Sequence, residues 1–359
     1  MNADVSRPPA VATSTPIAGL LEEDECDKIR AVKAWVVSML EERSSNGSQS
    51  PLSMPSAYWS DFCRYFSYML ALPEEYYGQL RLHTYHLDGD NYQAFYFGDG
   101  HSFRRALGYD ALVAGLPPQY RLSAPAILGE FGHHFDGALV NKAILRFQKT
   151  VRTLYLEGVL PQLEAAGKHS HLLEIGGGYG CLALHVKRLL KNATYWMVDL
   201  PETLLFAASY LSLALPEARI HFYDRQNPIP SQGRMADHDF VLLPNYALRR
   251  LQGVAFDLAL NTASFQEMSA DQLDEYLGYL QATAKLLYSS NHDVQDKNAE
   301  RIDVMGALRQ RFHVKEVQPL LPLRTKIRAL CYRAAYLLRL GEKPQDRGRY
   351  EREYVCIPR

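Results

Sequence analysis

An alternation of glycines flanked by two acidic residues is the part of this sequence best suited to chemistry. The glycines follow a short apolar run and are Gly176, Gly178 and Gly180. Glycine lets the backbone approach a ligand where any Cβ would collide, and a helix that begins there presents free N–H groups. Glu174 lies two residues before the first glycine, and Asp199 lies 25 residues after Glu174. The pattern predicts a binding loop for a nucleotide-type ligand.

Three details favour a methyl donor over a nicotinamide dinucleotide. Cys181 stands where the dinucleotide fingerprint has its third glycine. Glu174 ends a buried strand, where its carboxylate can accept a hydrogen bond from the amino group of S-adenosylmethionine, directly or through water, and would be unfavourable beside a pyrophosphate. Asp199 ends the next strand and can accept hydrogen bonds from both ribose hydroxyls. The combination resembles the class I S-adenosylmethionine-dependent methyltransferases over about residues 166–320.

Further donor contacts are expected from residues near the same edge of the sheet: Gln148, Tyr179, Leu200, Asn245 and Asn261. The amide of Gln148, in the segment entering the donor fold, could bond the donor's carboxylate. Asn245 could contact the adenine ring. If residues 219–223 form the third strand instead, Asp224 would make that contact. Asn261 would lie close to the methionine part. Tyr179 would either close over the cofactor or pack against the following helix.

Seven short runs resemble a family of bacterial sugar O-methyltransferases, over about residues 60–320. They are Leu128–Gly132, Val140–Lys142, Arg146–Gln148, Glu174–Gly180, Asp199–Glu202, Leu243–Asn245 and Asn261–Met268. The resemblance implies methyl transfer from S-adenosylmethionine to a hydroxyl of a sugar or a glycosylated small metabolite.

Transfer to a hydroxyl requires alignment of the reacting atoms within about 3–3.5 Å and a group that takes the proton. Gln266 and Glu267, in the turn after the fourth strand, are the preferred polar pair. Related O-methyltransferases carry a His-Asp pair in that turn, and their histidine takes the proton. Here a glutamine and a glutamate stand in those places, so we expect Glu267 to be the base or to orient one. The alternative is that Glu267 caps the following helix or bonds a backbone amide.

Histidines are the other candidates for proton transfer. His134 follows His133 in a glycine-flanked turn, and His292 follows the fifth strand, at the ligand edge of the sheet. His83 and His86 stand at i, i+3, but none of these histidines has a convincing metal-ligand spacing. We therefore predict no bound metal.

Alternation of strands with helices after about residue 169 predicts a Rossmann-like, doubly wound parallel sheet. The expected strands are 172–176, 195–199, 239–243, 256–261, 286–290 and 314–317, with 219–223 competing for the third and 354–357 as an antiparallel last strand. The expected helices are 182–190, 201–215, 269–284, 299–312 and about 325–340.

Three segments are expected along the chain: a disordered tail (1–18), a mainly helical substrate or lid domain (19–165), and the donor-binding Rossmann-like domain (166–359). A first helix is predicted at about 20–42, with Ala31, Val32 and Val36 on its apolar face, followed by a linker at 44–55. That helix could cover its own domain or mediate a homodimer. Residues 324–349 are basic, which favours a helix with a solvated face over a membrane-surface or anionic-partner role.

Composition limits the partners. The chain has 359 residues, a net charge of −1 and 47% hydrophobic residues, so nothing in it favours nucleic acid. Its five cysteines contain no CxxC pair, and no signal peptide or apolar run of about 20 residues is evident. These features favour a reduced, cytoplasmic protein without a transmembrane segment.

Three other functions fit parts of the pattern. The same chemistry could act on a phenolic or polyketide hydroxyl in antibiotic synthesis; a continuous apolar slot would favour that acceptor, whereas charged and amide groups would favour a sugar. A nicotinamide-dependent oxidoreductase would share the glycine loop, although Glu174 and Cys181 argue against it. A silent donor-binding protein would bind the donor and transfer nothing.

Overall fold

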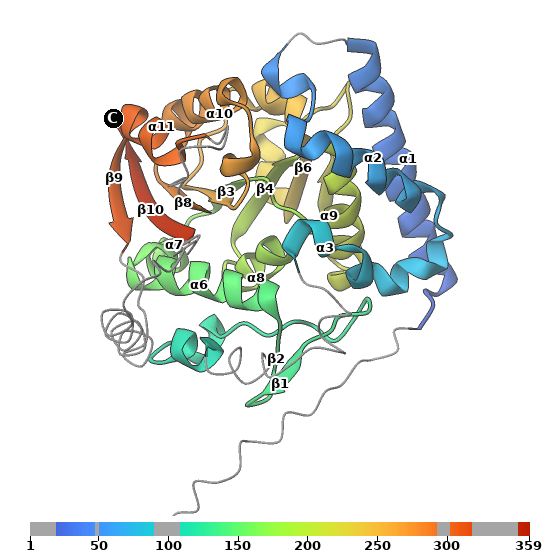
Figure 1. Ribbon diagram of the computed structural model, residues 1–359, viewed down its shortest axis with the longest axis horizontal. Coiled ribbons are helices and arrows are strands. Elements are labelled where there is room, and N and C mark those ends of the chain that lie inside the picture. Colours follow the sequence, from blue (N-terminus) through green and yellow to red (C-terminus); the bar gives the residue numbers. More distant parts are fainter. Residues whose placement is uncertain (1–18, 47–49, 90–107, 293–301, 318–350) are drawn as a thin grey trace, which may run out of the picture.

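The computed structural model describes residues 19–46, 50–89, 108–292, 302–317 and 351–359. At its centre is an eight-stranded sheet in the order β5-β6-β4-β3-β7-β8-β10-β9 (Figure 1). Its strands are β3 (Ser170–Ile175), β4 (Ala193–Asp199), β5 (Ile220–Phe222), β6 (Phe240–Pro244), β7 (Leu258–Thr262), β8 (Leu287–His292), β9 (Phe312–Val317) and β10 (Glu351–Pro358). The central strands are apolar and almost entirely buried, as expected where helices cover both faces of a sheet.

Neighbouring strands of this sheet pair in parallel except at β10, which is antiparallel to both β8 and β9. This arrangement confirms the expected Rossmann-like α/β sheet with an antiparallel last strand. Both candidates for the third strand form. β6 pairs with β4 and takes the third place, whereas β5 extends the edge beyond β6.

Two helices precede the first strand of this sheet, α6 (Lys142–Leu156) and α7 (Val159–Ala165). The helices between its strands are α8 (Cys181–Leu189), α9 (Pro201–Ala214), α10 (Ala270–Thr283) and α11 (Val304–Arg311). The connections through α8 and α9 run from β3 towards the β5 edge of the sheet. The connection through α10 runs from β7 to β8, in the opposite direction across the sheet. Right-handed crossovers therefore place α8 and α9 on one face and α10 on the other. α6 packs with α8, and α11 packs with α10.

The N-terminal part is mainly helical, as predicted. Its elements are α1 (Glu23–Asn46), η1 (Pro51–Ser53), α2 (Ala57–Ala71), η2 (Glu74–His83), α3 (Tyr85–Asp88), η3 (Pro118–Tyr120), β1 (His133–Phe135) and β2 (Ala138–Val140). The β1–β2 hairpin was not predicted. It turns at Asp136 and Gly137, both at positive φ, a conformation that glycine adopts freely and aspartate tolerates better than most residues. Short 3₁₀ segments also follow the sheet strands: η4 (Gln232–Asp237), η5 (Asn245–Leu251) and η6 (Phe265–Glu267).

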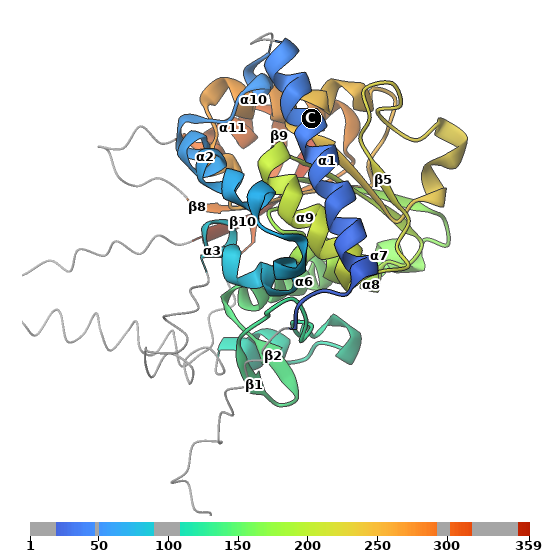
Figure 2. The ribbon, with the colours of Figure 1, turned by 90° about the vertical axis from the view of Figure 1, so that its right-hand side faces the viewer.

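Helix α1 lies along α9 (Figure 2). Its buried apolar residues include Ile29, Val32, Val36 and Met39, whereas Ala31, expected on the same face, is exposed. Trp35 donates from Nε1 to the carbonyl oxygen of Tyr223 at 2.7 Å, and Arg43 forms an ion pair with Glu202 at 2.5 Å. The apolar face of α1 is thus covered by this chain's own α9.

Several predicted boundaries shift. The first helix begins at Glu23 and ends at Asn46, so it runs into the expected linker, and Pro51–Ser53 forms a 3₁₀ turn that buries Leu52. The helix expected from residue 299 begins at Val304. The expected tail, the helix at about 325–340 and the basic segment at 324–349 lie outside the described residues.

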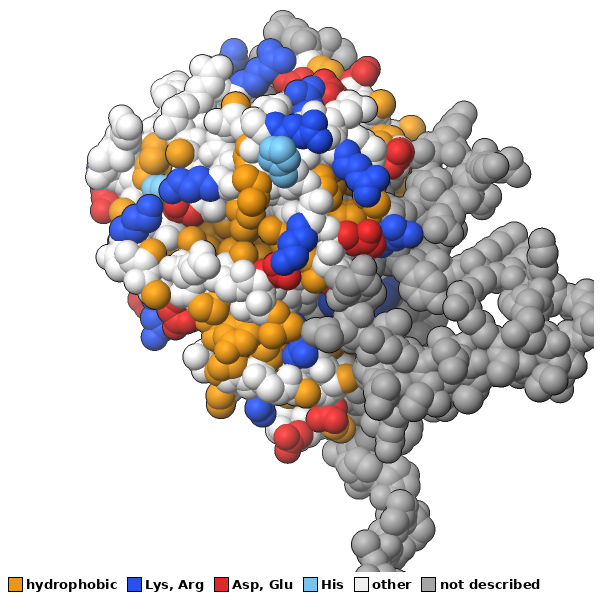
Figure 3. Space-filling model, turned by 90° about the vertical axis from the view of Figure 1, so that its left-hand side faces the viewer, with side chains coloured by type: hydrophobic (Ala, Val, Ile, Leu, Met, Phe, Trp, Pro, Cys, Tyr) orange, Lys and Arg blue, Asp and Glu red, His pale blue; other side chains and the backbone are white. Residues whose placement is uncertain are grey.

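The face at the β9 edge carries Lys and Arg side chains interspersed with acidic and apolar ones (Figure 3). No single sign of charge dominates it, in keeping with the net charge of −1. None of the described helices combines the length and apolarity that a membrane crossing requires. Four cysteines lie in the described part of the chain, and all four are free thiols: Cys26, Cys63, Cys181 and Cys356.

Candidate active site

A cleft of about 750 Å³ opens at the carboxyl ends of the sheet strands, where ligands bind in doubly wound folds. One side is formed by the strand ends and the turns that follow β3, β4, β6, β7 and β8. The other is formed by α6 and by the N-terminal segments that carry α2 and α3. A larger hollow of about 900 Å³ lies between α10 and α11, away from the strand ends.

The glycine loop after β3 forms part of the cleft through Gly176 and Gly178. Gly176 has a φ of +76°, and a Cβ added there would overlap the side chain of Ser264. Gly178 has a φ of +59°, and an added Cβ would meet nothing within 4 Å. Gly180 is the N-cap of α8 and packs against Leu211 of α9, so it shapes the loop without lining the cleft. The loop therefore presents bare backbone to a ligand at Gly178.

Asp199 ends β4 and faces the cleft. Its carboxylate accepts hydrogen bonds from the backbone N–H groups of Gly178 at 3.0 Å and Leu200 at 2.7 Å. Burial raises the pKa of Asp199 to about 7, and these backbone N–H bonds oppose the rise. Leu200 also lines the cleft and is the N-cap residue of α9.

Asn245 carries a buried acceptor that faces the cleft. Its Nδ2 donates to the carbonyl oxygen of Leu52 at 2.5 Å, which fixes the orientation of the amide. Its Oδ1 is buried and has no hydrogen-bond partner among the described residues. A buried carbonyl oxygen without a donor is unfavourable, so a ligand N–H at this place would relieve the cost.

Glu174 and Asn261 lie behind the cleft wall rather than in it. Tyr195 donates to Glu174 Oε2 at 2.8 Å, and burial raises the pKa of Glu174 to about 8. Asn261 donates to the carbonyl oxygen of Ile175 at 2.9 Å and accepts from the N–H of Phe265. These bonds connect the ends of β3 and β7, so Asn261 holds the two turns together.

Three predicted site residues lie away from the cleft. Gln148 is fully buried: it accepts from the N–H of Leu122 at 2.7 Å and donates to the carbonyl oxygen of Tyr120 at 2.9 Å, so its amide is used within the fold. Tyr179 is buried against Tyr210 of α9 instead of closing over the cleft. His134 is the exposed middle residue of β1 and does not line the cleft.

Tyr179 belongs to a buried ionic cluster that supports the glycine loop. The guanidinium of Arg81 lies 4.0 Å from the ring centre of Tyr179. Arg81 also forms ion pairs with Asp88 at 2.6 Å and Glu130 at 2.9 Å, and all three side chains are almost fully buried. Asn141, the N-cap of α6, donates to Glu130 at 2.8 Å, so the cluster joins the N-terminal part to the loop.

The turn after β7 and the end of β8 bring three of the expected catalytic candidates into the cleft: Gln266, Glu267 and His292. Gln266 Oε1 accepts from the N–H of His292 at 2.5 Å, which ties the turn to the end of β8. Glu267 is largely buried in η6, and burial raises its pKa to about 7, while the hydrogen bond from Trp59 and the charge of Arg146 oppose the rise. The helix that follows is capped by Ser269 with Gln272, so Glu267 is not its cap.

Several cleft residues were not predicted from the sequence, and two of them, Trp59 and Arg146, act on Glu267. Trp59 of α2 donates from Nε1 to Glu267 Oε2 at 3.1 Å. Arg146 of α6 lines the cleft, and the described residues offer its guanidinium no hydrogen bond or ion pair, although its charge lowers the pKa of Glu267. Arg146 lies in the same run as Gln148, and residues two apart point about 200° apart around a helix. A helical projection of α6 could therefore have indicated that only one of them faces the cleft.

Within the described ranges, no group of three or more His, Cys, Asp or Glu side chains is arranged to hold a metal ion. His83 bonds to Tyr68 through Nδ1 at 2.7 Å, whereas His86 lines the cleft beside Phe62.

No family model and no curated protein matches this chain. Solved structures with a similar arrangement include an O-methyltransferase family protein from Burkholderia thailandensis, at 12% identity and a TM-score of 0.34 over 61% of this chain and 60% of that one. Magnesium protoporphyrin IX methyltransferase from Synechocystis PCC 6803, with bound SAM, is 13% identical, with a TM-score of 0.34 over 59% of this chain and 84% of that one. An N-methyltransferase from Bradyrhizobium japonicum WM9, in complex with S-adenosylhomocysteine, is 12% identical, with a TM-score of 0.31 over 58% of this chain and 85% of that one. This chain thus spans less than two thirds of the first of these proteins, and similarities of this size do not bear on activity or substrate.

Proposed function

We propose that this protein is an S-adenosylmethionine-dependent O-methyltransferase that acts on a hydroxyl of a sugar or a glycosylated small metabolite. The observation that carries the proposal is a cleft whose lining combines the bare glycine loop and Asp199 with the carboxylate of Glu267. The first set suits a nucleoside, and the second supplies a carboxylate whose pKa of about 7 suits a general base near neutral pH.

The residues present fit the donor. Gly178 leaves space where a Cβ would stand, and the buried Oδ1 of Asn245 can accept from the exocyclic amine of adenine. Asp199, fixed by two backbone N–H groups, can accept from the ribose hydroxyls. Arg146 takes the carboxylate-binding role expected of Gln148, because it is the residue of that run that lines the cleft. Glu174 lies behind the wall and would act through water.

When bound, S-adenosylmethionine supplies a methyl group already activated on a sulfonium. The protein therefore has to hold the acceptor hydroxyl and remove its proton. Glu267 is the proposed proton acceptor, with Trp59 holding the carboxylate in place through Oε2. Gln266 and His292 lie beside it and are proposed to orient the acceptor.

The lining of the acceptor side favours a sugar. Charged and amide side chains line the cleft there, including Gln266 and Glu267. Such groups match the many hydroxyls of a saccharide, whereas a phenol needs a continuous apolar slot. A phenolic or polyketide acceptor is the second candidate, because Tyr58, Trp59 and Phe62 also line this side.

The test is calorimetric titration with S-adenosylhomocysteine and, separately, with NAD⁺, followed by transfer of labelled methyl from S-adenosylmethionine to saccharides and to phenols. Binding of S-adenosylhomocysteine with transfer to a saccharide hydroxyl is expected. Preference for NAD⁺ would identify an oxidoreductase, and donor binding without transfer to either panel would identify a silent protein; both results would overturn the proposal.

A further inference from the structure

A row of aromatic rings leads from the proposed base to the outside of the cleft. Its members are Trp59, Tyr58 and Phe62 of α2, and His86 and Tyr85 of α3. Tyr58 and Trp59 each pack on Phe62, with ring centres 5.2 Å and 5.5 Å away. Phe62 lies 4.8 Å from His86, which lies 5.0 Å from Tyr85. Two separate elements thus combine into one aromatic wall.

The two ends of this row differ in exposure. At its inner end, Trp59 bonds to Glu267, so the row starts at the proposed reacting centre. At its outer end, Tyr58 is 53% exposed and Tyr85 is 47% exposed, although both line the cleft. Aromatic rings in a core would be buried, whereas rings that keep this much surface at the mouth of a cleft are suited to contact a ligand.

We propose that the acceptor carries at least two sugar rings, and that the ring away from the methylated one stacks on Tyr58 and Tyr85. The inference rests on the proposed function and extends it from the reacting hydroxyl to the size of the acceptor. The inner part of the wall, beside Trp59, takes the ring that is methylated, because the proposed base Glu267 lies there.

The combination of aromatic rings and polar side chains on this surface favours a saccharide over a flat phenol. A sugar ring has an apolar face of C–H groups that packs on an aromatic ring, and an edge of hydroxyls that needs donors and acceptors. The cleft offers both along its length, with His86 and Glu267 lining it as well as the rings. A phenol would bury its faces between the rings and offer a single hydroxyl to the polar side chains that line the cleft.

The experiment uses the full-length protein saturated with S-adenosylhomocysteine. Methyl glycosides of glucose, galactose, rhamnose and glucuronic acid, disaccharides built from the same residues, and 2-naphthol are tested as probes by saturation-transfer NMR and calorimetry. Among the saccharides that bind, we expect the disaccharides to bind at least about tenfold more tightly than the monosaccharides, from the stacking contribution of two rings. The double variant Tyr58→Ala/Tyr85→Ala should remove that advantage, and Tyr58→Phe/Tyr85→Phe should keep it.

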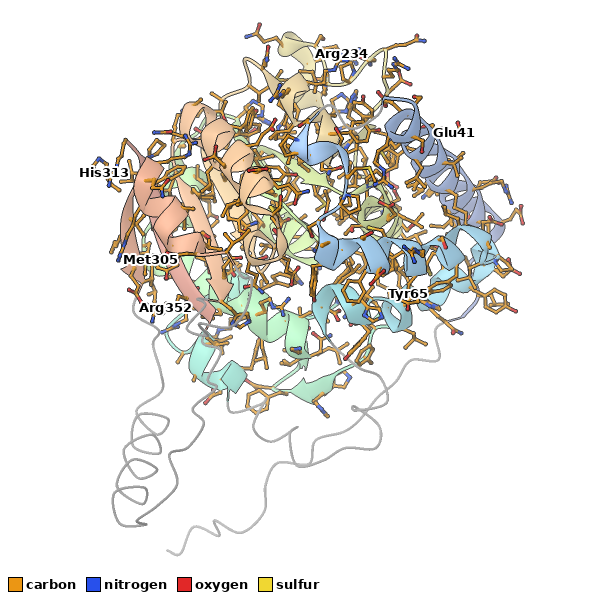
Figure 4. The ribbon with its side chains drawn as sticks, turned by 45° about the horizontal axis from the view of Figure 1, so that its top comes forward. Glu41, Tyr65, Arg234, Met305, His313 and Arg352 are labelled. Carbon is orange, nitrogen blue, oxygen red and sulfur yellow. The ribbon has the colours of Figure 1, made fainter. Side chains whose placement is uncertain are left out.

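Tyr65→Ala is the matched control, because Tyr65 belongs to the same helix, is 67% exposed and does not line the cleft (Figure 4). The inference is overturned if disaccharides have no advantage over monosaccharides, if the alanine variant keeps that advantage, or if only 2-naphthol binds. It is equally overturned if S-adenosylhomocysteine binds and none of the saccharides does. Failure of S-adenosylhomocysteine to bind would instead remove the proposed function itself.

Discussion

The indole nitrogen of Trp59 lies 3.1 Å from Oε2 of Glu267, although 208 residues separate the two in the sequence. Ser56, the N-cap of α2, also donates to the backbone oxygen of Glu267 at 2.6 Å. The first turn of α2 therefore holds the proposed base through both its side chain and its backbone. The N-terminal part of the chain consequently contributes to the reacting centre as well as to the acceptor side of the cleft.

Replacing the proposed base should separate catalysis from donor binding. In Glu267→Gln, the amide keeps the shape of the side chain but cannot accept a proton, so we expect kcat to fall by about 10²–10⁴-fold. The dissociation constant for S-adenosylhomocysteine should stay within about twofold. A variant that turns over normally while binding the donor normally would show that Glu267 is not the base.

The pH dependence should report the same carboxylate. Burial raises the pKa of Glu267 to about 7, and only its ionised form can accept a proton. The value of kcat/KM should therefore fall about tenfold per pH unit below that pKa and level off above it. In Trp59→Phe the carboxylate loses a hydrogen bond that stabilises its ionised form, so the midpoint should move to higher pH. A midpoint that stays in place or moves down would contradict the assigned contact.

Alanine substitutions at the two cleft glycines should have different effects, one on ligand binding and the other on stability. In Gly178→Ala, the new Cβ enters open space in the cleft, and the φ of +59° costs roughly 1–2 kcal/mol. We expect loss of S-adenosylhomocysteine binding with a modest drop in Tm. In Gly176→Ala, the Cβ meets Ser264, so the fold itself should be destabilised more strongly. Calorimetry and thermal unfolding of both variants give the comparison, and unimpaired binding by Gly178→Ala would refute the loop's role.

Arg146 should act on one functional group of the donor. S-adenosylhomocysteine has a carboxylate, whereas 5′-methylthioadenosine lacks the whole amino-acid part. A charge-assisted hydrogen bond contributes about 1.5–3 kcal/mol, so Arg146→Met should weaken S-adenosylhomocysteine about 10–100-fold. Binding of 5′-methylthioadenosine should not change. Equal weakening of both ligands would show that Arg146 supports the cleft without contacting the carboxylate.

The buried cluster around Arg81 should govern stability. Arg81→Met leaves Asp88 and Glu130 buried without their cation, which typically costs about 3–5 kcal/mol in the free energy of unfolding. Arg64→Met is the control, because Arg64 reaches Asp61 at 4.0 Å on the exposed side of α2 and such pairs contribute about 0–1 kcal/mol. Urea unfolding of both proteins measures the difference, and equal midpoints would contradict the cluster's role.

Local sequence patterns were enough to predict the sheet and the loop of the cleft. Buried parallel strands are short apolar runs, and glycines directly after such a run indicate a tight turn that a ligand can approach. Gly178 and Asp199 could therefore be assigned to the ligand edge of the sheet from the sequence alone. Glu267 could be placed for the same reason, since it follows a strand that ends at the same edge of the sheet. These residues are positioned by elements adjacent to them in sequence.

Residues positioned by distant contacts could not be predicted. The direction of Gln148 depends on Leu122 and Tyr120, which form a pocket for its amide. Tyr179 turns inwards because Arg81, far away in sequence, provides a cation beneath its ring. Trp59 is recognisable as apolar, but its bond to Glu267 exists only after the N-terminal part docks on the sheet. Sequence periodicity contains no information about such pairings.

The packing of α1 on α9 has a consequence for synthesis. Trp35 of α1 finds its hydrogen-bond partner at Tyr223, 188 residues later. At about 5–20 residues per second on the ribosome, the nascent chain would wait roughly 10–40 s before that partner emerges. During that time the apolar face of α1 has no cover from the sheet helices. We therefore expect a chaperone to bind the face of α1 early in synthesis, and ribosome-released fragments that end before α9 to aggregate.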